Sequence, residues 1–300
     1  MAALKEEEEG FESQSTESET TLPPSSDVTA HIGSCPDFHA ALKELPEYGI
    51  CMALTGTRAS GKTHLLKYIM SLIHKSRKID TVFLISATAK QQHDDSAYDY
   101  IPQIFRFTKL ARVREILEKQ QEVVDKNKLL QAMYEQDGRG SKKKPKFATS
   151  RITIILDDFF AMGVVHHKGL TSLCTHGRHL TFTDPSTKEV LCRVDAVFLS
   201  QDLTQMNTVM RSNLDYVVSA RAMSFRAQKM TVEAYLTIGL TRKEGRALLS
   251  SLSDKPYTFA FINIVKQPKS KVTDYVYFCR APKTIGKFRI GKKEYFEMDT

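Results

Sequence analysis

Residues 56–63 read Gly56-Thr57-Arg58-Ala59-Ser60-Gly61-Lys62-Thr63. The segment has the complete spacing G-x-x-x-x-G-K-S/T of a phosphate-binding loop. Gly56 and Gly61 permit backbone conformations in which successive N–H groups surround a phosphate. The Lys62 side chain can reach the β- and γ-phosphates, and the Thr63 hydroxyl is a ligand for Mg²⁺. The sequence therefore predicts that this whole segment binds the phosphates of a nucleotide, with Thr63 also holding the metal.

The segments on either side of residues 56–63 support this interpretation. Residues 50–55 (ICMALT) form a short apolar run typical of a buried strand, and residues 63–74 place apolar side chains along one side of a predicted helix. A helix that begins here directs the positive end of its dipole at the same anion. The alternative, a Gly-rich turn that happens to contain Lys-Thr, does not explain why the motif joins a buried strand to an amphipathic helix.

Two adjacent acids follow a second apolar run. Residues 152–156 (ITIIL) predict a buried strand, and Asp157 and Asp158 come directly after it. Ligands of open α/β sheets bind at the carboxyl ends of the strands, so Asp157 is expected to hold Mg²⁺, directly or through water. Asp158 would then orient and polarise the water that attacks the γ-phosphate. The alternative is a strand that runs into an ordinary Asp-initiated turn or helix N-cap.

The acid pair favours hydrolysis over phosphoryl transfer to a small acceptor, because it includes a carboxylate that can activate water. The chain has no NKxD segment of the kind that selects guanine nucleotides. The expected ligands are therefore ATP and Mg²⁺, and the expected activity is ATP hydrolysis.

Strand and helix patterns alternate along the chain. A long helix is predicted over residues 110–134, and residues 179–194 predict a hairpin that turns at Asp184-Pro185-Ser186. Further strands are predicted at residues 81–86, 194–200, 216–220, 257–264 and 275–280. This alternation indicates an α/β fold of the P-loop NTPase type, with a mostly parallel central sheet, helices on both faces and additional C-terminal strands.

Composition restricts the class of protein. Hydrophobic residues make up 41% and charged residues 26% of the chain, which is typical of a soluble globular protein. No apolar run is long enough to span a membrane, and the N-terminus has no apolar segment of a secretory signal, so a secreted protein is not expected. The five cysteines are scattered and form no CxxC pair, which favours a reducing compartment and argues against structural zinc.

The charge is unevenly distributed. Residues 1–27 have a balance of −7, whereas the whole chain carries +8, so the remainder carries +15. An excess of this size favours a polyanionic partner, nucleic acid first, although a merely soluble basic surface is the alternative. We predict a disordered acidic tail at residues 1–34 and one ATPase domain at residues 35–300. Its motor core would span about residues 48–220 and a C-terminal extension residues 221–300.

Three later segments complete an ordered series with the phosphate-binding loop and the acids: His176-Gly177-Arg178-His179-Leu180, Phe198-Leu199-Ser200-Gln201 and Met210-Arg211-Ser212-Asn213. The series resembles the genome-packaging ATPases of poxviruses and other large DNA viruses, which belong to the FtsK/HerA-like group of P-loop motors. The similarity covers roughly residues 48–220. One departure is the insertion DPSTKEV, which separates the Gly-Arg-His segment from the strand that ends in Gln201.

The resemblance implies roles for single residues. Arg178 would be an arginine finger that reaches the nucleotide of a neighbouring subunit, since a guanidinium stabilises charge on γ-phosphate oxygens. Gln201 would be the polar sensor of the γ-phosphate, and Arg211 a second finger or sensor. The alternatives are a cation at a helix C-terminus for Arg178, a strand-end cap for Gln201 and a surface charge for Arg211.

The resemblance also implies partners and a location. A motor of this group would assemble into a homo-oligomeric ring, act on double-stranded DNA and contact capsid or portal-vertex proteins. It would work in the host-cell cytoplasm, in a viral factory, or in the nucleus, and it could enter the virion. A motor needs sequence-independent phosphate contacts. Two basic segments could supply them, and the first competes with a nuclear-localisation signal: Lys142, Lys143, Lys144 and Lys146, then Lys283, Lys287, Arg289, Lys292 and Lys293.

The sequence leaves other functions open. The same domain could be a DNA helicase or segregation pump outside packaging, or a nucleotide-binding scaffold that loads DNA without turnover. A small-molecule kinase is disfavoured by the basic body and by the arginine-finger candidates.

Overall fold

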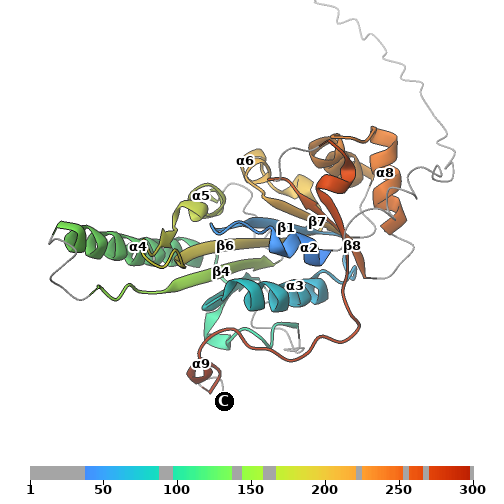
Figure 1. The fold of residues 1–300 in the computed structure, drawn as a ribbon. Coiled ribbons are helices and arrows are strands. Elements are labelled where there is room, and N and C mark those ends of the chain that lie inside the picture. Colours follow the sequence, from blue (N-terminus) through green and yellow to red (C-terminus); the bar gives the residue numbers. More distant parts are fainter. Residues whose placement is uncertain are drawn as a thin grey trace, which may run out of the picture.

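A computed structural model describes residues 38–87, 97–136, 144–157, 167–220, 225–252, 257–265 and 270–297. The predicted acidic tail at residues 1–34 and the predicted catalytic acid Asp158 lie outside these ranges. In the described part, a 9-stranded sheet runs through the molecule in the order β3-β2-β4-β6-β1-β7-β8-β9, with β5 paired to β6 (Figure 1). The strands are β1 (Cys51–Thr55), β2 (Thr81–Ser86), β3 (Arg106–Phe107), β4 (Ser150–Asp157), β5 (Phe182–Thr183), β6 (Val190–Ser200), β7 (Tyr216–Ala220), β8 (Thr258–Asn263) and β9 (Val276–Arg280).

The directions of the strands define one functional edge. β3, β2, β4, β6, β1 and β7 are mutually parallel, whereas β8 is antiparallel to both β7 and β9. The parallel strands therefore all end at the same side of the sheet, which we name the carboxyl edge. Because β8 runs the opposite way, its first residue and the last residue of β9 also lie at this edge. Thr258 and Arg280 are paired across these two strands.

Helices cover both faces of the sheet. The main ones are α2 (Phe38–Lys43), α3 (Lys62–Arg77), α4 (Arg112–Gln136), α5 (Lys168–His176), α6 (Thr208–Ser212), α7 (Phe225–Thr231), α8 (Arg242–Ser251) and α9 (Lys293–Glu297). Side chains of β1 alternate between two cores, with Cys51 and Ala53 in one and Met52 and Leu54 in the other. The first core packs against α4, α5, α6 and α8, and the second against α2 and α3. In Figure 1, α5, α6 and α8 lie on one side of the sheet and α3 on the other.

The predicted α/β fold is confirmed. Each predicted strand is present within a few residues of its expected limits, and two of them, Thr81–Ser86 and Tyr216–Ala220, match their predicted bounds. The predicted hairpin is also present, since β5 and β6 pair antiparallel. Asp184 fixes its turn, because its Oδ1 accepts hydrogen bonds from the backbone N–H and the hydroxyl of Ser186. The sequence analysis missed β3, which has only 2 residues and therefore no readable periodicity.

No helix in the described ranges is both long enough and apolar enough to cross a membrane.

Candidate nucleotide site

The phosphate-binding loop lies at the carboxyl edge, between β1 and α3. β1 ends at Thr55, and the Gly56 N–H then donates to the Ser200 carbonyl oxygen at 3.2 Å, which ties the start of the loop to the end of β6. Helix α3 begins at Lys62, and the Leu65 N–H donates to the Gly61 carbonyl at 2.9 Å. The strand–loop–helix context expected from the sequence is therefore present, with the helix N-terminus directed at the loop.

Both glycines of the loop are required by geometry. A Cβ atom at Gly56 would lie 2.6 Å from the Ala220 Cβ and 2.8 Å from the Ser60 Oγ, so a side chain does not fit there. Gly61 has φ 86°, a left-handed conformation that residues with a side chain rarely adopt. Ala59 shares a positive φ of 59°. The loop thus has the tight backbone path that presents successive N–H groups to an anion.

Lys62 places its charge over the same loop. Its Nζ donates hydrogen bonds to the carbonyl oxygens of Gly56 at 2.7 Å and Thr57 at 2.8 Å. The ammonium group is therefore held above the loop that would surround a phosphate.

Asp157 reaches the loop through a tyrosine that the sequence analysis did not single out. Asp157 is the last residue of β4, pairs in register with Leu199 and is 8% exposed. The Tyr98 hydroxyl donates to its Oδ2 at 2.6 Å, and the Thr63 side chain hydrogen-bonds to the same hydroxyl. Burial first, and then the nearby Asp157 charge, raises the pKa of Tyr98 well above its usual value, so the hydroxyl keeps its proton. Tyr98 thereby connects both predicted metal ligands.

The donor set at this position fits Mg²⁺. Thr63 offers a hydroxyl oxygen and Asp157 a carboxylate oxygen, and hard oxygen donors are those that Mg²⁺ prefers. One or two protein ligands are usual, with water and substrate phosphates completing the coordination. Across the described ranges there is no cluster of three or more His, Cys, Asp or Glu side chains that could hold a different metal.

Gln201 also belongs to this edge. It is exposed and comes directly after Ser200, the residue whose carbonyl accepts the Gly56 N–H. Ser200 is itself anchored, since its hydroxyl bonds to Asp202 and to Gln205. The position is the one expected for a γ-phosphate sensor, and the role remains a prediction.

Arg178 lies at the opposite edge of the sheet. Its Nη2 donates to the Asn213 carbonyl at 2.9 Å and lies 3.5 Å from the Asp215 Oδ1. The other Asp215 oxygen accepts the N–H of Cys51, the first residue of β1, at 2.7 Å. The loop starts at the other end of β1, roughly 16 Å away at the rise of a strand. Arg178 is therefore not part of the nucleotide site of its own subunit, and its predicted role at a neighbouring subunit's nucleotide stays a prediction.

Arg211 lies on α6, in the crossover between β6 and β7. Its guanidinium donates to the Met206 carbonyl and to the Thr208 hydroxyl, both on its own segment. It also lines a pocket of about 370 Å³ together with Arg226 and Lys229. The structure therefore places Arg211 in a basic pocket of the first core's face, and its predicted role as a second finger or sensor stays untested.

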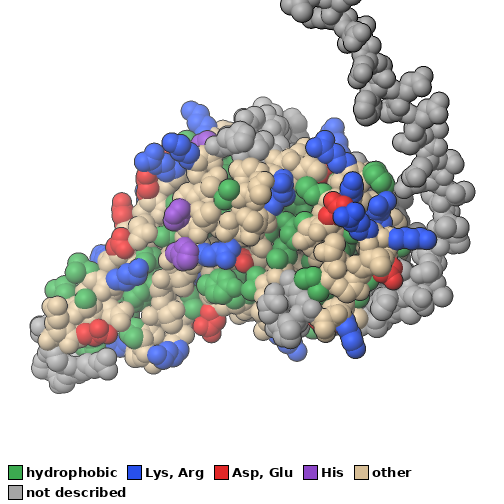
Figure 2. All heavy atoms as spheres, turned by 90° about the horizontal axis from the view of Figure 1, so that it is seen from above, with side chains coloured by type: hydrophobic (Ala, Val, Ile, Leu, Met, Phe, Trp, Pro, Cys, Tyr) green, Lys and Arg blue, Asp and Glu red, His purple; other side chains and the backbone are tan. Residues whose placement is uncertain are grey.

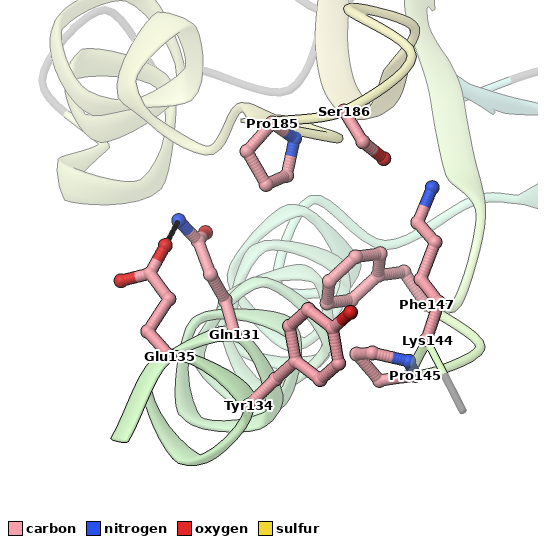
Figure 3. Close-up of a pocket in the computed structure, with 8 residues that line it drawn as sticks. All are labelled: Gln131, Tyr134, Glu135, Lys144, Pro145, Phe147, Pro185 and Ser186. Carbon is pink, nitrogen blue, oxygen red and sulfur yellow. Dashed lines mark hydrogen bonds between the residues drawn. The ribbon is translucent and has the colours of Figure 1, made fainter. Parts of the chain in front are cut away.

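The two basic segments have different surroundings. Lys142 and Lys143 lie outside the described ranges. Lys144 pairs with Asp184 at 2.8 Å and lines a pocket of about 200 Å³ between the end of α4 and the hairpin, shown in Figure 3 with Phe147 and Pro185. Because β4 begins next to this segment, the pocket lies beyond the amino edge, away from the nucleotide site. In the second segment, three side chains contact residues of α9: Arg289 lies over Phe296, Lys292 over Tyr295, and Lys293 pairs with Glu297.

Replacing Tyr98 by Phe should weaken Mg²⁺ binding without unfolding the protein. The ring stays in the core, but Asp157 and Thr63 lose the hydroxyl that orients them, and groups that orient metal ligands typically contribute about 10- to 100-fold in metal affinity or activity. The measurement is ATP turnover as a function of Mg²⁺ concentration. The half-saturating Mg²⁺ concentration should rise, and excess Mg²⁺ should restore much of the rate.

A matched control lies two residues away. Tyr100 is also buried, but its hydroxyl has no hydrogen-bond partner in the described part of the chain, so Tyr100→Phe removes an oxygen without breaking a bond. We expect this variant to keep the Mg²⁺ dependence of the wild type. An equal effect of both substitutions would show that Tyr98 contributes only packing.

Comparison with known proteins identifies relatives. Residues 38–253 match the sequence model of a family described as Poxvirus A32 protein. The match covers well over half of the chain and confirms the resemblance drawn from the ordered motifs. No curated protein sequence matches the chain significantly.

Solved structures with a similar arrangement are more distant. The genome packaging NTPase B204 from Sulfolobus turreted icosahedral virus 2, in complex with ATP-gammaS, is 13% identical with a TM-score of 0.45, and the match covers 78% of this chain and 98% of that one. The pCW3 conjugation coupling protein TcpA, with ATPgS, is 12% identical with a TM-score of 0.48 over 78% of this chain and 60% of that one. EssC (ATPases 2 and 3) from Geobacillus thermodenitrificans is 8% identical with a TM-score of 0.46 over 84% and 43%.

Proposed function

The chain belongs to the poxvirus A32 protein family, and from this premise we propose that it is an ATP-hydrolysing motor that translocates double-stranded viral DNA into a capsid. The observation that carries the proposal is the joining of the two predicted phosphate and metal motifs through Tyr98. That tyrosine hydrogen-bonds to Asp157 at 2.6 Å and also to Thr63. A loop that only resembled a phosphate-binding segment would not require a buried carboxylate at this place.

The residues divide the work of hydrolysis. The loop amides and Lys62 bind the phosphates, and Thr63 and Asp157 hold Mg²⁺, which neutralises charge on the β- and γ-phosphate oxygens when bound. Asp158 orients the attacking water, and Gln201 senses the γ-phosphate. Arg178 completes the site of a neighbouring subunit in a homo-oligomeric ring, with Arg211 as the second candidate for that role.

A basic surface supports a DNA partner. Residues outside the N-terminal tail carry a balance of +15, and double-stranded DNA is bound mainly through its phosphates. Figure 2 shows Lys and Arg side chains gathered over the end of the molecule that carries α7 and α8. Arg226 and Lys229 lie on α7 and line a pocket together with Arg211 and the acidic Glu233. Contacts of this kind are independent of sequence, as translocation requires.

Steady-state ATP hydrolysis with and without double-stranded DNA tests the proposal. Duplex DNA should stimulate turnover, and the stimulation should fall steeply as salt is raised, because phosphate contacts release counterions. Lys62→Ala serves as the inactive control for contaminating ATPases. Binding of nucleotide with no turnover at any protein concentration, even with DNA, would favour the nucleotide-binding scaffold and remove the roles given to Asp158 and Arg178.

The site itself would serve a DNA helicase or translocase outside packaging equally well. Co-purification with capsid or portal-vertex proteins from infected cells distinguishes the two, since only a packaging motor needs that contact. A packaging motor would also be found in the host cytoplasm, at viral factories, or in the nucleus, and it could be retained in the virion.

A further inference from the structure

A second pocket adjoins the phosphate-binding loop on the side away from Asp157. It has a volume of about 300 Å³ and is lined by Tyr68, Tyr257, Arg280, Ala281, Pro282 and Lys283. Four of these residues follow or end β9, and Tyr257 precedes β8, so the C-terminal extension supplies most of the pocket. We name it the Tyr257 pocket. None of the motifs that identified the motor core includes these residues.

The strand order explains why this pocket lies beside the loop. In the sheet, β4 with Asp157 lies two positions from β1 on one side, and β8 and β9 lie on the other side beyond β7. Because β8 is antiparallel, Tyr257 comes to the carboxyl edge just before Thr258, next to Arg280 at the end of β9. The loop is thus flanked by the metal ligands on one side and by the Tyr257 pocket on the other.

Direct contacts fix the pocket to the start of α3. A Cβ atom at Gly61 would lie 3.0 Å from the Tyr257 Cδ1, so the ring lies against the loop backbone. The rings of Tyr257 and His64 have centroids 5.8 Å apart, and His64 Nε2 lies 2.7 Å from the Pro282 carbonyl oxygen. Tyr257 is nevertheless 47% exposed, so much of its surface is open to a ligand. It also has φ 60°, an unusual backbone for a residue with a side chain.

We propose that the Tyr257 pocket binds the nucleoside of the nucleotide, with the base stacked on Tyr257 and the charges of Arg280 and Lys283 beside the α-phosphate and ribose. This inference rests on the proposed nucleotide-binding function and adds a part of the site to it. The γ-phosphate end must face Lys62, Thr63 and Asp157, so the triphosphate crosses the loop and its nucleoside end leaves toward β8 and β9. A pocket of about 300 Å³ is at the size of small-ligand sites.

The chemistry of the pocket favours a nucleoside. An aromatic ring gives a base a stacking surface, and base–aromatic stacking tolerates any base because every base has a π-face. Two cations beside that ring suit a ligand that carries a polyphosphate. Stacking without a set of paired donors and acceptors predicts weak discrimination among bases, so affinity should follow stacking strength more than base identity.

Two probes separate the two halves of the site. A non-hydrolysable ATP analogue carries both the phosphates and a base that can stack on Tyr257, whereas inorganic tripolyphosphate carries the phosphates alone and has no base to stack there. Equilibrium binding of each is measured with the full chain and Mg²⁺. Tyr257→Ala should lower the affinity for the analogue by roughly tenfold, because stacking on one aromatic side chain contributes about that factor to binding of a base. The affinity for tripolyphosphate should not change. Tyr257→Phe should bind both probes as the wild type does.

The control variants guard against trivial effects. Tyr48→Ala removes another exposed tyrosine, 36% exposed and at the amino edge, and should change neither probe. Tyr257→Leu keeps apolar packing against Gly61 and His64 but has no π-face. It should lower the affinity for the analogue as Tyr257→Ala does. If Tyr257→Ala does not fold, Tyr257→Leu is the variant that tests whether the base stacks on Tyr257.

Each result has a distinct meaning. An analogue affinity unchanged in Tyr257→Leu overturns the nucleoside pocket, as does equal weakening of both probes. A Tyr257 substitution that weakens single-stranded DNA binding but not the analogue also overturns it and assigns the pocket to nucleic acid. Failure of the wild type to bind either probe contradicts the proposed function instead, and Lys62→Ala should lose both probes if that function holds.

Discussion

Replacing Lys62 by Ala is expected to lower ATP turnover by about 10³-fold, because loss of one preorganised charge at the transferred phosphate typically costs that much. In the structure the Lys62 Nζ donates hydrogen bonds to the carbonyl oxygens of Gly56 and Thr57 at 2.7 and 2.8 Å, which holds its charge over the phosphate-binding loop. The substitution removes the cation but should not change the structure of β1, the loop or α3. Turnover under saturating ATP, with and without DNA, is the measurement.

Lys75→Ala is a matched control for this experiment. Lys75 lies on the same helix, in its last turn, and is exposed at the opposite edge of the sheet. Its removal changes net charge by the same amount and should leave turnover unchanged. A Lys62→Ala enzyme within about tenfold of the wild-type rate would be incompatible with transition-state stabilisation at this loop.

Arg178→Ala should also reduce turnover by about 10³-fold, the lower end of the contribution of an arginine finger. Arg178 lies at the edge of the sheet opposite its own loop, so the loss must occur at a neighbouring subunit's site. Mixing with Lys62→Ala tests this directly. In a ring of head-to-tail contacts, about a quarter of the interfaces of an equal mixture combine an intact loop with an intact Arg178, so activity should return to that extent.

The stability of Arg178→Ala must be measured together with its turnover, because Arg178 also pairs with the buried Asp215. Burial raises the pKa of Asp215, while the hydrogen bond from Cys51 and the charge of Arg178 lower it. Removing Arg178 therefore raises this pKa further. A carboxyl with a raised pKa in the folded state favours folding when protonated, so the stability of Arg178→Ala should be retained in acid and decline as pH rises through the pKa of Asp215. Thermal unfolding, measured from a pH below the ordinary carboxyl pKa upward, follows this change.

Arg178→Lys separates the finger from the ion pair. Lysine keeps a positive charge near Asp215 but lacks the planar fork that a finger presents to a γ-phosphate. If Arg178 is an arginine finger, Arg178→Lys should have low turnover and the stability of the wild type. Normal turnover in Arg178→Lys, together with low stability in Arg178→Ala, would reduce Arg178 to a structural partner of Asp215.

Much of the fold was predictable from the sequence. The strands that form the centre of the sheet are continuous apolar runs, because both faces are covered by helices, and such runs are readable one segment at a time. The hairpin at Asp184 could also be predicted from neighbouring residues alone, because its turn depends on the side chain of one aspartate and the residues that follow it. β3 and the direction of β8 depended on pairing with distant strands and could not be read from any single segment.

The sequence by itself determined the phosphate-binding half of the site, because residues 56–63 are contiguous and their function resides in the path of one loop and one helix N-terminus. Only the tertiary structure decided the rest. Tyr98 and Asp157 are 59 residues apart in the chain and share a hydrogen bond, Tyr257 lies against Gly61, and Arg178 lies at the far edge beside Asp215. These relations follow from strand order, strand direction and register. Such features are set by packing between segments, so no local pattern records them.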